Sequence, residues 1–440
     1  MMSKDIAILG GGISGAGAAM LAKKNGLNVF VSDNSCIDNM YKELFIQNNI
    51  EFEEKKHTSS IILSAKEIIK SPGIPDDIPI IKEILNKGIL IISEIEFAYR
   101  YTNAKIAAVT GTNGKTTTCL LLGHILKSAG YDVKVLGNIG AGFAFSLLHR
   151  DYEYIILELS SFQLDYIKDF RSKVSILLNI TPDHLDRYNH NIEEYFSSKC
   201  KITANQISED FFIYNADQAC MQEISTKAKK IPISIIKELE IGAYFKNNTI
   251  TLNLNNKIMT IQELALQGKH NAFNSMAAAI AARVFEVKDS IIRQSMIDFQ
   301  NVEHRLEYVI TVHGIEFIND SKATNVNASW FALESMNKNI VWIAGGVDKG
   351  NNYSELLPIV KDKVRSIVCL GNNNENIVNS FKSDVDAIVE ASSMKEAVSH
   401  AYNLALKGDI VLLSPACASF DLFQNYEDRG LQFKKEVRKL

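Results

Sequence analysis

The sequence predicts an α/β protein in which the strands of mainly parallel sheets alternate with helices. Short apolar runs rich in β-branched residues alternate with helical stretches along all 440 residues. Glycine-rich segments follow several of these runs, as they do where a strand leads into a helix around a phosphate. Single domains typically hold about 100–200 residues, so the chain exceeds one core. We expect three domains, at residues 1–103, 104–303 and 304–440.

The first domain combines predicted strands with a glycine-rich loop. Strands are expected at residues 6–9, 29–31, 61–63 and 89–92, and helices at 16–25 and 80–87. Gly10, Gly12 and Gly15 follow the first strand and Asp33 follows the second, which is the spacing of a dinucleotide fold. Glycines there admit any diphosphate, so NAD and a UDP sugar both remain open. Ser71-Pro72-Gly73-Ile74 is a rigid turn with the same ambiguity.

The second domain opens with a phosphate-binding loop. The apolar run 106–109 leads into Gly111-Thr112-Asn113-Gly114-Lys115-Thr116-Thr117-Thr118, and a helical stretch follows at 119–128. The glycines let backbone N–H groups face one concavity, Lys115 adds a charge, and a threonine hydroxyl is a ligand for Mg²⁺. The spacing is shorter than the usual G-x-x-x-x-G-K-[ST] pattern. The segment predicts triphosphate binding, and a turn without a ligand is the alternative.

Further loops of this domain carry candidate side chains. Strands are expected at 154–158 and 174–179, and helices at 192–204 and after Asn271. Glu158 ends the first of these strands, where a buried carboxylate needs a partner such as Mg²⁺, or else faces water. His184 lies in the polar loop after the second strand, and a lone histidine there is more often a surface or satisfied core residue than a ligand. Composition alone makes Lys199 a solvated helix lysine.

The third domain places polar loops near its predicted strands at 316–318, 340–344, 366–370 and 409–413. These loops combine lysines, hydroxyl groups and glycines, and they lie at 304–305, 319–325, 345–350 and 413–421. Open α/β sheets bind ligands beyond the carboxyl ends of their strands. The loops therefore indicate an anionic ligand, although each one alone is ordinary turn chemistry.

Composition excludes several function classes. The formal charge is −4 and the lysine and arginine residues are scattered, so no nucleic acid is expected as a partner. No apolar run reaches about 18 residues, and glycines interrupt the apolar stretch 6–22, so we expect neither a membrane span nor a leader sequence. The cysteines are widely spaced and predict isolated buried thiols in a reducing cytoplasm, namely Cys36, Cys119, Cys200, Cys220, Cys369 and Cys417.

Over essentially its whole length the chain resembles the Mur ligases. The short phosphate loop at 110–117 and the division into three domains are similar to theirs. The segments that carry the resemblance in combination are Ser71-Pro72-Gly73-Ile74, Glu158-Leu159-Ser160-Ser161-Phe162-Gln163-Leu164, Asn319-Asp320-Ser321-Lys322-Ala323-Thr324-Asn325 and Ser414-Pro415-Ala416-Cys417-Ala418-Ser419-Phe420-Asp421. The resemblance implies Rossmann-like first and third domains around a central P-loop ATPase domain.

The resemblance also implies an activity. Within the family, the motifs are most similar to those of members that add D-glutamate to UDP-N-acetylmuramoyl-L-alanine, through an acyl phosphate, in peptidoglycan precursor synthesis. Such a ligase uses ATP with two Mg²⁺ ions and acts in cell wall biogenesis, cell shape, cell division and the cell cycle. The resemblance further implies a cytoplasmic monomer.

Individual residues receive roles from the resemblance. Catalytic roles are implied for Lys115, Glu158, His184 and Lys199, and metal ligation for Thr116, Glu158, His184 and a carbamylated Lys199. ATP contacts are implied for Gly111, Thr112, Asn113, Gly114, Lys115, Thr116, Thr117, Asn271, Arg305 and Asp320. Substrate contacts are implied for Ile13, Ser14, Asp33, Ser71 and Gly73 at the uridine end, Asn138 and Ser160 at the muramoyl end, and Lys322, Thr324, Lys349, Ser419 and Tyr426 around D-glutamate.

Three alternatives remain open. The first alternative is another amino-acid ligase of the same superfamily, of the L-alanine-adding or folylpolyglutamate type. The segment Ser414-Pro415-Ala416-Cys417 argues against it. An NAD-dependent oxidoreductase would use the first glycine loop, but it leaves the phosphate loop and Lys322 unexplained. A non-catalytic nucleotide-sensing module is the third.

Overall fold

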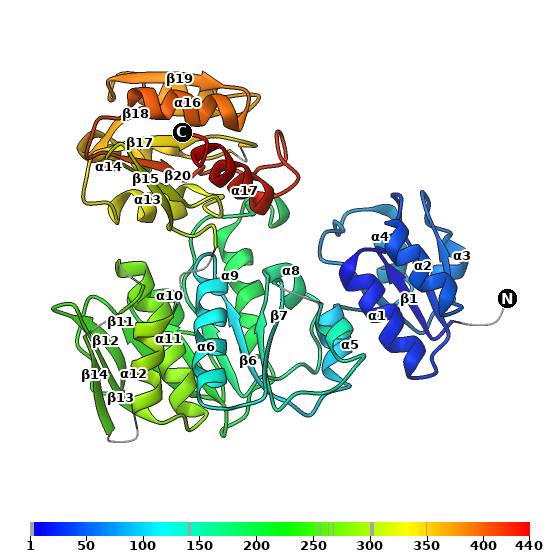
Figure 1. The fold of residues 1–440 in the computed structure, drawn as a ribbon. Helices are drawn as coiled ribbons and strands as arrows, with labels where there is room; N and C mark the ends of the chain where they lie inside the picture. The colour runs from blue at the N-terminus through cyan, green and yellow to red at the C-terminus, as the bar shows by residue number, and fades with distance from the viewer. Residues whose placement is uncertain are drawn as a thin grey trace. The chain divides into compact units, whose positions relative to one another are not determined.

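The computed structural model describes residues 4–139, 142–254, 257–262, 264–266, 268–299, 303–348 and 350–440. The chain packs as two compact units, and each is described by itself. Unit 1 comprises Met1–Leu264 and Ala272–Asp298, and unit 2 comprises Ala265–Asn271 and Phe299–Leu440. Three separate sheets with their helices confirm the predicted α/β class (Figure 1). The domain bounds at 103 and 303 stay a prediction.

The first sheet of unit 1 is entirely parallel, with strand order β3-β2-β1-β4-β5. Its strands are β1 (Ile6–Leu9), β2 (Val29–Ser32), β3 (Glu51–Glu53), β4 (Glu67–Lys70) and β5 (Leu90–Ile92). The helices are α1 (Ile13–Lys24), α2 (Asn39–Gln47), α3 (Ser59–Ile62), α4 (Pro79–Asn86) and α5 (Glu94–Tyr99). The order reverses at β1, and ligands of open α/β sheets bind at such a reversal.

One predicted strand of this sheet is wrong. Residues 61–63 lie at the end of helix α3 and just beyond it, and the strand is instead β4, a few residues later. A short apolar run does not distinguish a strand from a helical turn by periodicity. The strand that was missed, Glu-Ile-Ile-Lys, has polar ends, and its Lys70 is buried by pairing with Asp76 at 2.6 Å.

The second sheet of unit 1 has nine strands in the order β14-β13-β12-β11-β10-β9-β6-β8-β7. They are β6 (Lys105–Thr110), β7 (Val133–Gly137), β8 (Tyr154–Glu158), β9 (Val174–Leu177), β10 (Phe211–Asn215), β11 (Lys229–Ser234), β12 (Gly242–Lys246), β13 (Thr249–Leu254) and β14 (Lys257–Ile261). Strands β12 to β14 pair antiparallel, so the sheet is mixed at that edge. Strand β6 lies between β9 and β8, and all three are parallel.

The helices of this part begin with α6 (Lys115–Ser128), directly after the glycines of the phosphate loop. The others are α7 (Phe143–Ser146), α8 (Ser161–Leu164), η1 (Leu185–Arg187), α9 (Ile192–Cys200), η2 (Lys201–Thr203), α10 (Ala219–Gln222), α11 (Lys269–Val284) and α12 (Asp289–Asp298). The helix predicted at 192–204 is therefore α9 followed by one 3₁₀ turn.

Unit 2 contains a six-stranded sheet with the order β15-β16-β20-β17-β18-β19. Its strands are β15 (Glu307–Val312), β16 (Ile315–Asn319), β17 (Ile340–Ala344), β18 (Val364–Leu370), β19 (Ala387–Ala391) and β20 (Ile410–Leu413). The edge strand β15 is antiparallel to β16, and the rest are parallel. The helices are α13 (Val326–Glu334), η3 (Tyr353–Leu356), α14 (Leu357–Lys363), α15 (Glu375–Phe381), α16 (Met394–Leu404) and α17 (Tyr426–Val437).

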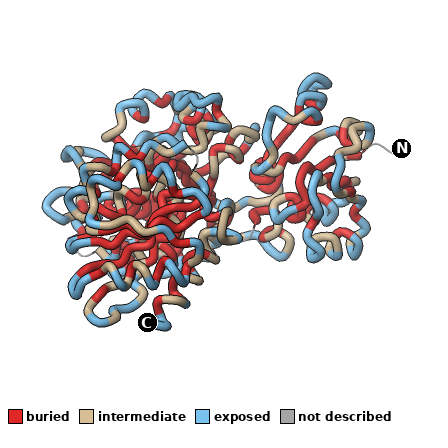
Figure 2. The backbone as a smooth tube through the Cα atoms, turned by 90° about the horizontal axis from the view of Figure 1, so that it is seen from above, coloured by how far each residue is buried: buried red, intermediate tan, exposed pale blue. Residues whose placement is uncertain are grey.

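Central parallel strands are buried on both faces, which explains their nearly continuous apolar sequences. In β17, Ile340, Trp342 and Ala344 join the core cluster on one face, whereas Val341 and Ile343 join the cluster on the other. Figure 2 shows runs of buried residues, in red, inside the parts of the chain drawn. This two-sided burial fixes where each strand ends and thus where the loops that follow it lie.

Two sequence expectations about the surface have different outcomes. All six cysteines are free, but the expectation of buried thiols is wrong for Cys36 and Cys220, which are exposed, and Cys200 is only partly buried. The two exposed cysteines lie outside strands, where a small side chain is not forced inward. Among the described residues, no helix is long and apolar enough to cross a membrane.

Replacing Trp342 tests the core of unit 2. Its side chain is fully buried, and its Nε1–H donates to the carbonyl of Ser414 at 2.7 Å. Trp342→Ala should lower the free energy of unfolding of unit 2 by about 3–5 kcal/mol, because it leaves a large cavity. Trp342→Phe should cost less. The chain has 2 tryptophans, so Trp330 fluorescence in urea reports unfolding in the variants. Trp330→Phe is the control, and an unchanged urea midpoint in Trp342→Ala would contradict the packing described.

Candidate functional site

The glycine loop after β1 is held against two neighbouring loops of the first sheet. The Asp33 carboxylate accepts the Gly11 N–H at 2.7 Å, and the Ser71 N–H donates to the carbonyl of Leu9 at 3.0 Å. Gly10 has φ +95, and a Cβ there would lie 2.5 Å from Ser71 Oγ, so only glycine fits. The structure thus brings Asp33 and Ser71 to the loop that leads into Ile13 and Ser14, the first residues of α1. Ile13 is exposed, as a ligand contact requires.

The predicted phosphate loop connects β6 to α6. Gly111 and Gly114 have φ +146 and +84, and a Cβ on Gly114 would lie 2.2 Å from Asn274 Oδ1. Asn179 fastens the loop from the next strand: its Oδ1 accepts the Asn113 N–H at 2.8 Å, and its Nδ2 donates to the Asn113 carbonyl at 3.0 Å. These contacts leave the loop backbone curved into the helix N-terminus, which is the geometry that binds phosphate.

Glu158 lies beside the phosphate loop at the end of β8. Glu158 is only 3% exposed, and Thr116 Oγ1 donates to its Oε2 at 2.7 Å. Asn138 donates to it twice, from Nδ2 to Oε1 at 3.3 Å and from its backbone N–H to the Glu158 carbonyl oxygen at 2.9 Å. The alternative of a carboxylate facing water is therefore wrong. A buried carboxylate and a hydroxyl side by side are oxygen donors of the kind that Mg²⁺ takes.

Lys199 and Lys115 share one acceptor. Lys115 Nζ donates to the carbonyl oxygens of Gly111 and Thr112 at 2.8 and 2.7 Å, and Lys199 Nζ donates to the same Gly111 oxygen at 3.2 Å. Lys199 is 2% exposed, with its Nζ 4.5 Å from the ring centroid of Tyr195. Burial, together with the charge of Lys115, holds the pKa of Lys199 well below its ordinary value.

The neighbouring lysine is different. Lys201 pairs with Asp165 at 2.7 Å and remains partly exposed. The structure therefore contradicts the reading of Lys199 as a solvated helix lysine, and that reading fits Lys201 instead. In the sequence, Lys199 and Lys201 have neighbours of the same kinds. In the structure, only Lys199, on helix α9, reaches the phosphate loop.

His184 lies on a separate loop before η1. Its backbone is left-handed, with φ 54, its ring centroid lies 5.4 Å from that of Phe162, and its Nε2 lies 3.8 Å from Asp183 Oδ1. Ser160, at the end of β8, caps α8 through a reciprocal hydrogen-bond pair with Gln163. Metal ligation by His184 and substrate contact by Ser160 stay predictions.

In unit 2, three loops meet beyond the carboxyl ends of β16, β17 and β20. The Asp320 N–H donates to the Leu413 carbonyl at 2.7 Å, and the Ala416 N–H donates to the Ala323 carbonyl at 3.0 Å. The Val347 N–H donates to the Ala418 carbonyl at 2.8 Å. These loops therefore lie together at the carboxyl edge of the sheet, and the anionic ligand stays a prediction.

Asp320 and Arg429 are the charged groups buried among these loops. Asp320 accepts the Ser414 hydroxyl at 2.8 Å and the Leu306 N–H at 3.2 Å, and burial raises its pKa to about 7. Arg429, on α17, donates to Ser321 Oγ at 3.0 Å and to the Cys417 carbonyl at 3.2 Å. Burial lowers the pKa of Arg429 to about 10. Arg429 thus ties two of the loops together.

The remaining predicted residues have varied surroundings. Lys322 Nζ lies 4.9 Å from the ring centroid of Tyr426, and Ser419 is 2% exposed. The positive charge of Arg305 opposes the rise in the pKa of Asp320. Four further positions lie as follows: Thr324 is half-buried between Ala323 and α13, Asn271 is in the first turn of α11, Gly73 is in the turn after β4, and Lys349 is outside the described residues.

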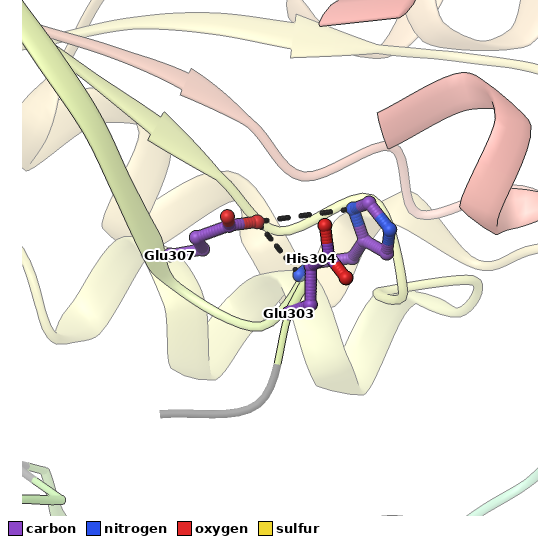
Figure 3. Close-up of side chains that lie close together, drawn as sticks. All are labelled: Glu303, His304 and Glu307. Carbon is purple, nitrogen blue, oxygen red and sulfur yellow. Dashed lines mark hydrogen bonds and ion pairs between the residues drawn. The ribbon is translucent and has the colours of Figure 1, made fainter. Parts of the chain in front are cut away.

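One cluster has the residue types of a metal site. Figure 3 shows Glu303, His304 and Glu307, whose ligand atoms lie within 4.8 Å of one another. Lys434 pairs with both carboxylates, at 2.9 Å from Glu307, and Asn319 Nδ2 lies 2.9 Å from His304 Nδ1. Lys434 already pairs with both carboxylates, so we interpret the cluster as an ion-pair network.

Sequence reasoning missed several residues that build the site. Asn179, Tyr195 and Arg429 hold the phosphate loop or the loops of unit 2, and Asp165 pairs with Lys201. No local spacing identified them. The one usable signal was that Asn179 is the last residue of the strand predicted at 174–179.

Three family models match the chain. They are the Mur ligase MurD-like N-terminal domain at residues 4–93, the Mur ligase middle domain at 109–282, and the Mur ligase glutamate ligase domain at 304–417. The matches leave short connecting stretches near the proposed domain bounds and cover well over half of the chain.

Full-length relatives have high identity. The UDP-N-acetylmuramoylalanine--D-glutamate ligase of Christiangramia forsetii is 52% identical over 445 residues, with 100% of both chains covered. The protein of the same name from Porphyromonas gingivalis strain W83 is 51% identical over 444 residues, with 99% of both covered.

Solved structures share the fold at low identity. UDP-N-acetylmuramate-alanine ligase MurC of Thermotoga maritima has a TM-score of 0.62 at 19% identity, covering 99% of both chains. MurF ligase of the same organism, solved in complex with ADP, has a TM-score of 0.63 at 15% identity, covering 94% of this chain and 95% of its own. Family models, relatives and fold agree, and the chain belongs to the Mur ligase family.

Proposed function

We propose that this chain adds D-glutamate to UDP-N-acetylmuramoyl-L-alanine with the hydrolysis of ATP. The observation that carries the proposal is the phosphate loop, in which Thr116 is hydrogen-bonded to the buried Glu158 and two lysines meet at Gly111. This arrangement suits phosphoryl transfer, and the relatives of about half identity over the whole chain bear the name of this ligase.

The reaction proceeds in two steps. An oxygen of the L-alanyl carboxylate attacks the γ-phosphorus of ATP, the bond to the β-phosphate oxygen breaks, and ADP leaves. The amine of D-glutamate then attacks the carbonyl carbon of the acyl phosphate, loses a proton, and expels inorganic phosphate as the amide forms. The transferring group carries negative charge, so catalysis consists mainly of positioning and charge stabilisation.

Residues of the phosphate loop supply that stabilisation. Backbone N–H groups of residues 111–117 and the α6 N-terminus receive the phosphates, and Lys115 turns from its own loop carbonyls to the transferred group. Thr116 and Glu158 would hold one Mg²⁺, and His184 with Lys199 a second. Bound Mg²⁺ offsets phosphate charge and orients the γ-phosphoryl group. Asn271, Arg305 and Asp320 complete the proposed ATP contacts.

We propose that Lys199 is carbamylated. The low pKa of its amine favours the neutral form, which attacks the carbon of CO₂ and gives up a proton to solvent, leaving an N–C bond and a carbamate anion. The anion replaces repulsion from Lys115 by attraction and adds oxygen ligands for Mg²⁺. The shared Gly111 oxygen and the burial of Lys199 support this chemistry.

The substrate contacts and setting follow from the same proposal. The loops of Ile13, Asp33 and Ser71 receive the uridine end, Asn138 and Ser160 the muramoyl end, and the D-glutamate contacts are those named from the sequence, Lys349 included.

The six free thiols and the use of ATP support a cytoplasmic location. A monomer with the domains 1–103, 104–303 and 304–440 stays our expectation, and sedimentation tests its size.

Turnover with defined substrates tests the function. Phosphate release should require ATP, Mg²⁺, UDP-N-acetylmuramoyl-L-alanine and D-glutamate together, because the amine is needed to expel phosphate, and chelation of Mg²⁺ should abolish it. Equal turnover with L-alanine or L-lysine in place of D-glutamate would reject the amino-acid assignment. Nucleotide binding without any turnover would favour a sensing module instead.

Replacing Lys199 tests the carbamate. Lys199→Ala should lose at least about 100-fold in kcat, as removal of a group that stabilises transition-state charge typically does. Added acetate or formate should restore part of the rate, because it supplies the missing carboxylate oxygens. Lys201→Ala, two residues away, is the matched control and should keep its activity. Unchanged turnover in Lys199→Ala would refute the role.

A further inference from the structure

The turn of residues 71–74, which carries the proposed substrate contacts Ser71 and Gly73, is tied to a part of unit 1 that is distant in sequence. The Ile74 N–H donates to the Ser71 carbonyl at 3.1 Å and closes the turn. The carbonyl of Ile74 accepts a hydrogen bond from Arg187 Nη2 at 3.1 Å, across 113 positions of sequence. Arg187 therefore fixes the end of the turn next to Gly73.

The guanidinium of Arg187 also lies on the ring of Phe162, in α8. Its central carbon is 4.6 Å from the ring centroid, which is within the range of a cation–π contact. The Phe162 ring packs edge-to-face on the ring of His184, with the two centroids 5.4 Å apart. The backbone N–H of Arg187 donates to the carbonyl of His184 at 3.0 Å, in the turn of η1. Arg187 is thus joined to His184 through Phe162 and through the backbone.

The ring of Phe162 has a fixed place beside the proposed site. Glu158 ends β8 and Ser160 caps α8, so Phe162 belongs to the same short stretch of chain as a proposed Mg²⁺ ligand and a proposed muramoyl contact. Tyr188, which is 7% exposed, stacks on Phe162 with the ring centroids 5.9 Å apart. Closely packed rings do not shift independently of their neighbours, so the position of Arg187 bears on that of His184.

A second tie holds the same stretch of the first sheet, but through different contacts. The Tyr166 hydroxyl donates to Asp76 Oδ1 at 2.7 Å, and Lys70 Nζ pairs with the same oxygen at 2.6 Å. Lys70 Nζ also lies 4.4 Å from the centroid of the Tyr166 ring. Tyr166 therefore fastens the residues just after the turn through Asp76 and Lys70, and not through the ring beside His184.

Surface packing alone explains other arginines of this chain better than it explains Arg187. Arg150 lies 4.3 Å from the ring centroid of Tyr152 and pairs with Asp132 at 2.7 Å, and such exposed contacts contribute only about 0.5–1 kcal/mol. Arg187 differs because its N–H group donates to the backbone of the turn that carries the proposed substrate contacts. A planar guanidinium is able to stack by its face and donate from its edge at once, which a lysine ammonium is not.

We propose that Arg187 is a positioning residue, which holds the turn of residues 71–74 and the side chain of His184 in one arrangement. The inference rests on the proposed function, in which the turn receives the uridine end of UDP-N-acetylmuramoyl-L-alanine and His184 is a ligand of Mg²⁺. Because one guanidinium holds both, the binding of substrate and the binding of metal are linked. Such linkage is reciprocal, so each ligand raises the affinity for the other.

Arg187→Gln and Tyr166→Phe form a matched pair of variants, because each removes one tie to residues 74–76. Arg187→Gln should raise the KM for UDP-N-acetylmuramoyl-L-alanine about 10-fold, the effect of losing a charged hydrogen-bond donor. It should also raise the Mg²⁺ concentration at half-maximal rate about 10-fold, as loss of a group that orients a metal ligand typically does. The KM for D-glutamate should change less than about twofold. Tyr166→Phe should leave the half-maximal Mg²⁺ concentration unchanged, and Arg187→Lys should fall between the wild type and Arg187→Gln.

Two further measurements need no turnover. In metal-free protein, amide hydrogen exchange should accelerate at residues 73–77 and at residues 183–188 in Arg187→Gln, but only at residues 73–77 in Tyr166→Phe. Binding of Mn²⁺ in the presence of ADP, followed by electron paramagnetic resonance, should become about fivefold tighter or more when UDP-N-acetylmuramoyl-L-alanine is added to the wild type. The same addition to Arg187→Gln should change Mn²⁺ binding less than about twofold.

The outcomes separate this inference from the proposed function. A lower Tm in Arg187→Gln with an unchanged half-maximal Mg²⁺ concentration would make Arg187 a packing residue and overturn the inference, and so would an equal shift in Tyr166→Phe. Exchange that accelerates only at residues 73–77 in metal-free Arg187→Gln would overturn the link to His184 even in an active enzyme. A wild-type protein without turnover would overturn the proposed function instead.

Discussion

The carbonyl oxygen of Gly111 accepts a hydrogen bond from Lys115 and another from Lys199, and the chemistry of the phosphate loop depends on this shared acceptor. Two ammonium groups that share one acceptor in buried surroundings repel each other, because little water screens their charges. Lys115 keeps two carbonyl partners, whereas Lys199 is buried against Tyr195 with one. Burial and the neighbouring charge of Lys115 therefore hold the pKa of Lys199 well below its ordinary value and favour its neutral amine.

All three sheets position their candidate loops in the same way. In each of the three sheets, the loops with candidate residues follow adjacent parallel strands: β1, β2 and β4; then β6, β8 and β9; and then β16, β17 and β20. Because those strands are buried on both faces, their ends are fixed in register, and the loops inherit that precision. Glycines such as Gly10 and Gly114 remove the side chains that would keep neighbouring loops apart.

Sequence reasoning found what is local. The phosphate loop, the position of Glu158 and the loops of unit 2 each follow from a few consecutive residues, and the structure confirms those elements. It did not find contacts that depend on how distant segments pack. Lys199 and Lys201 look alike in the sequence, residues 61–63 look like a strand, and Arg429 looks like an ordinary helix residue. In each case, the contacts of a side chain depend on how its helix or strand is oriented once the apolar face is buried. The spacing of neighbouring residues does not determine that orientation.

The state of Lys199 is measured most directly by carbon-13 NMR of the wild-type protein equilibrated with ¹³C-labelled bicarbonate. A carbamate resonance should appear in the wild type and in Lys201→Ala and should be absent from Lys199→Ala. A spectrum without that resonance in the active wild type, or with it retained in Lys199→Ala, would contradict the carbamate at the phosphate loop.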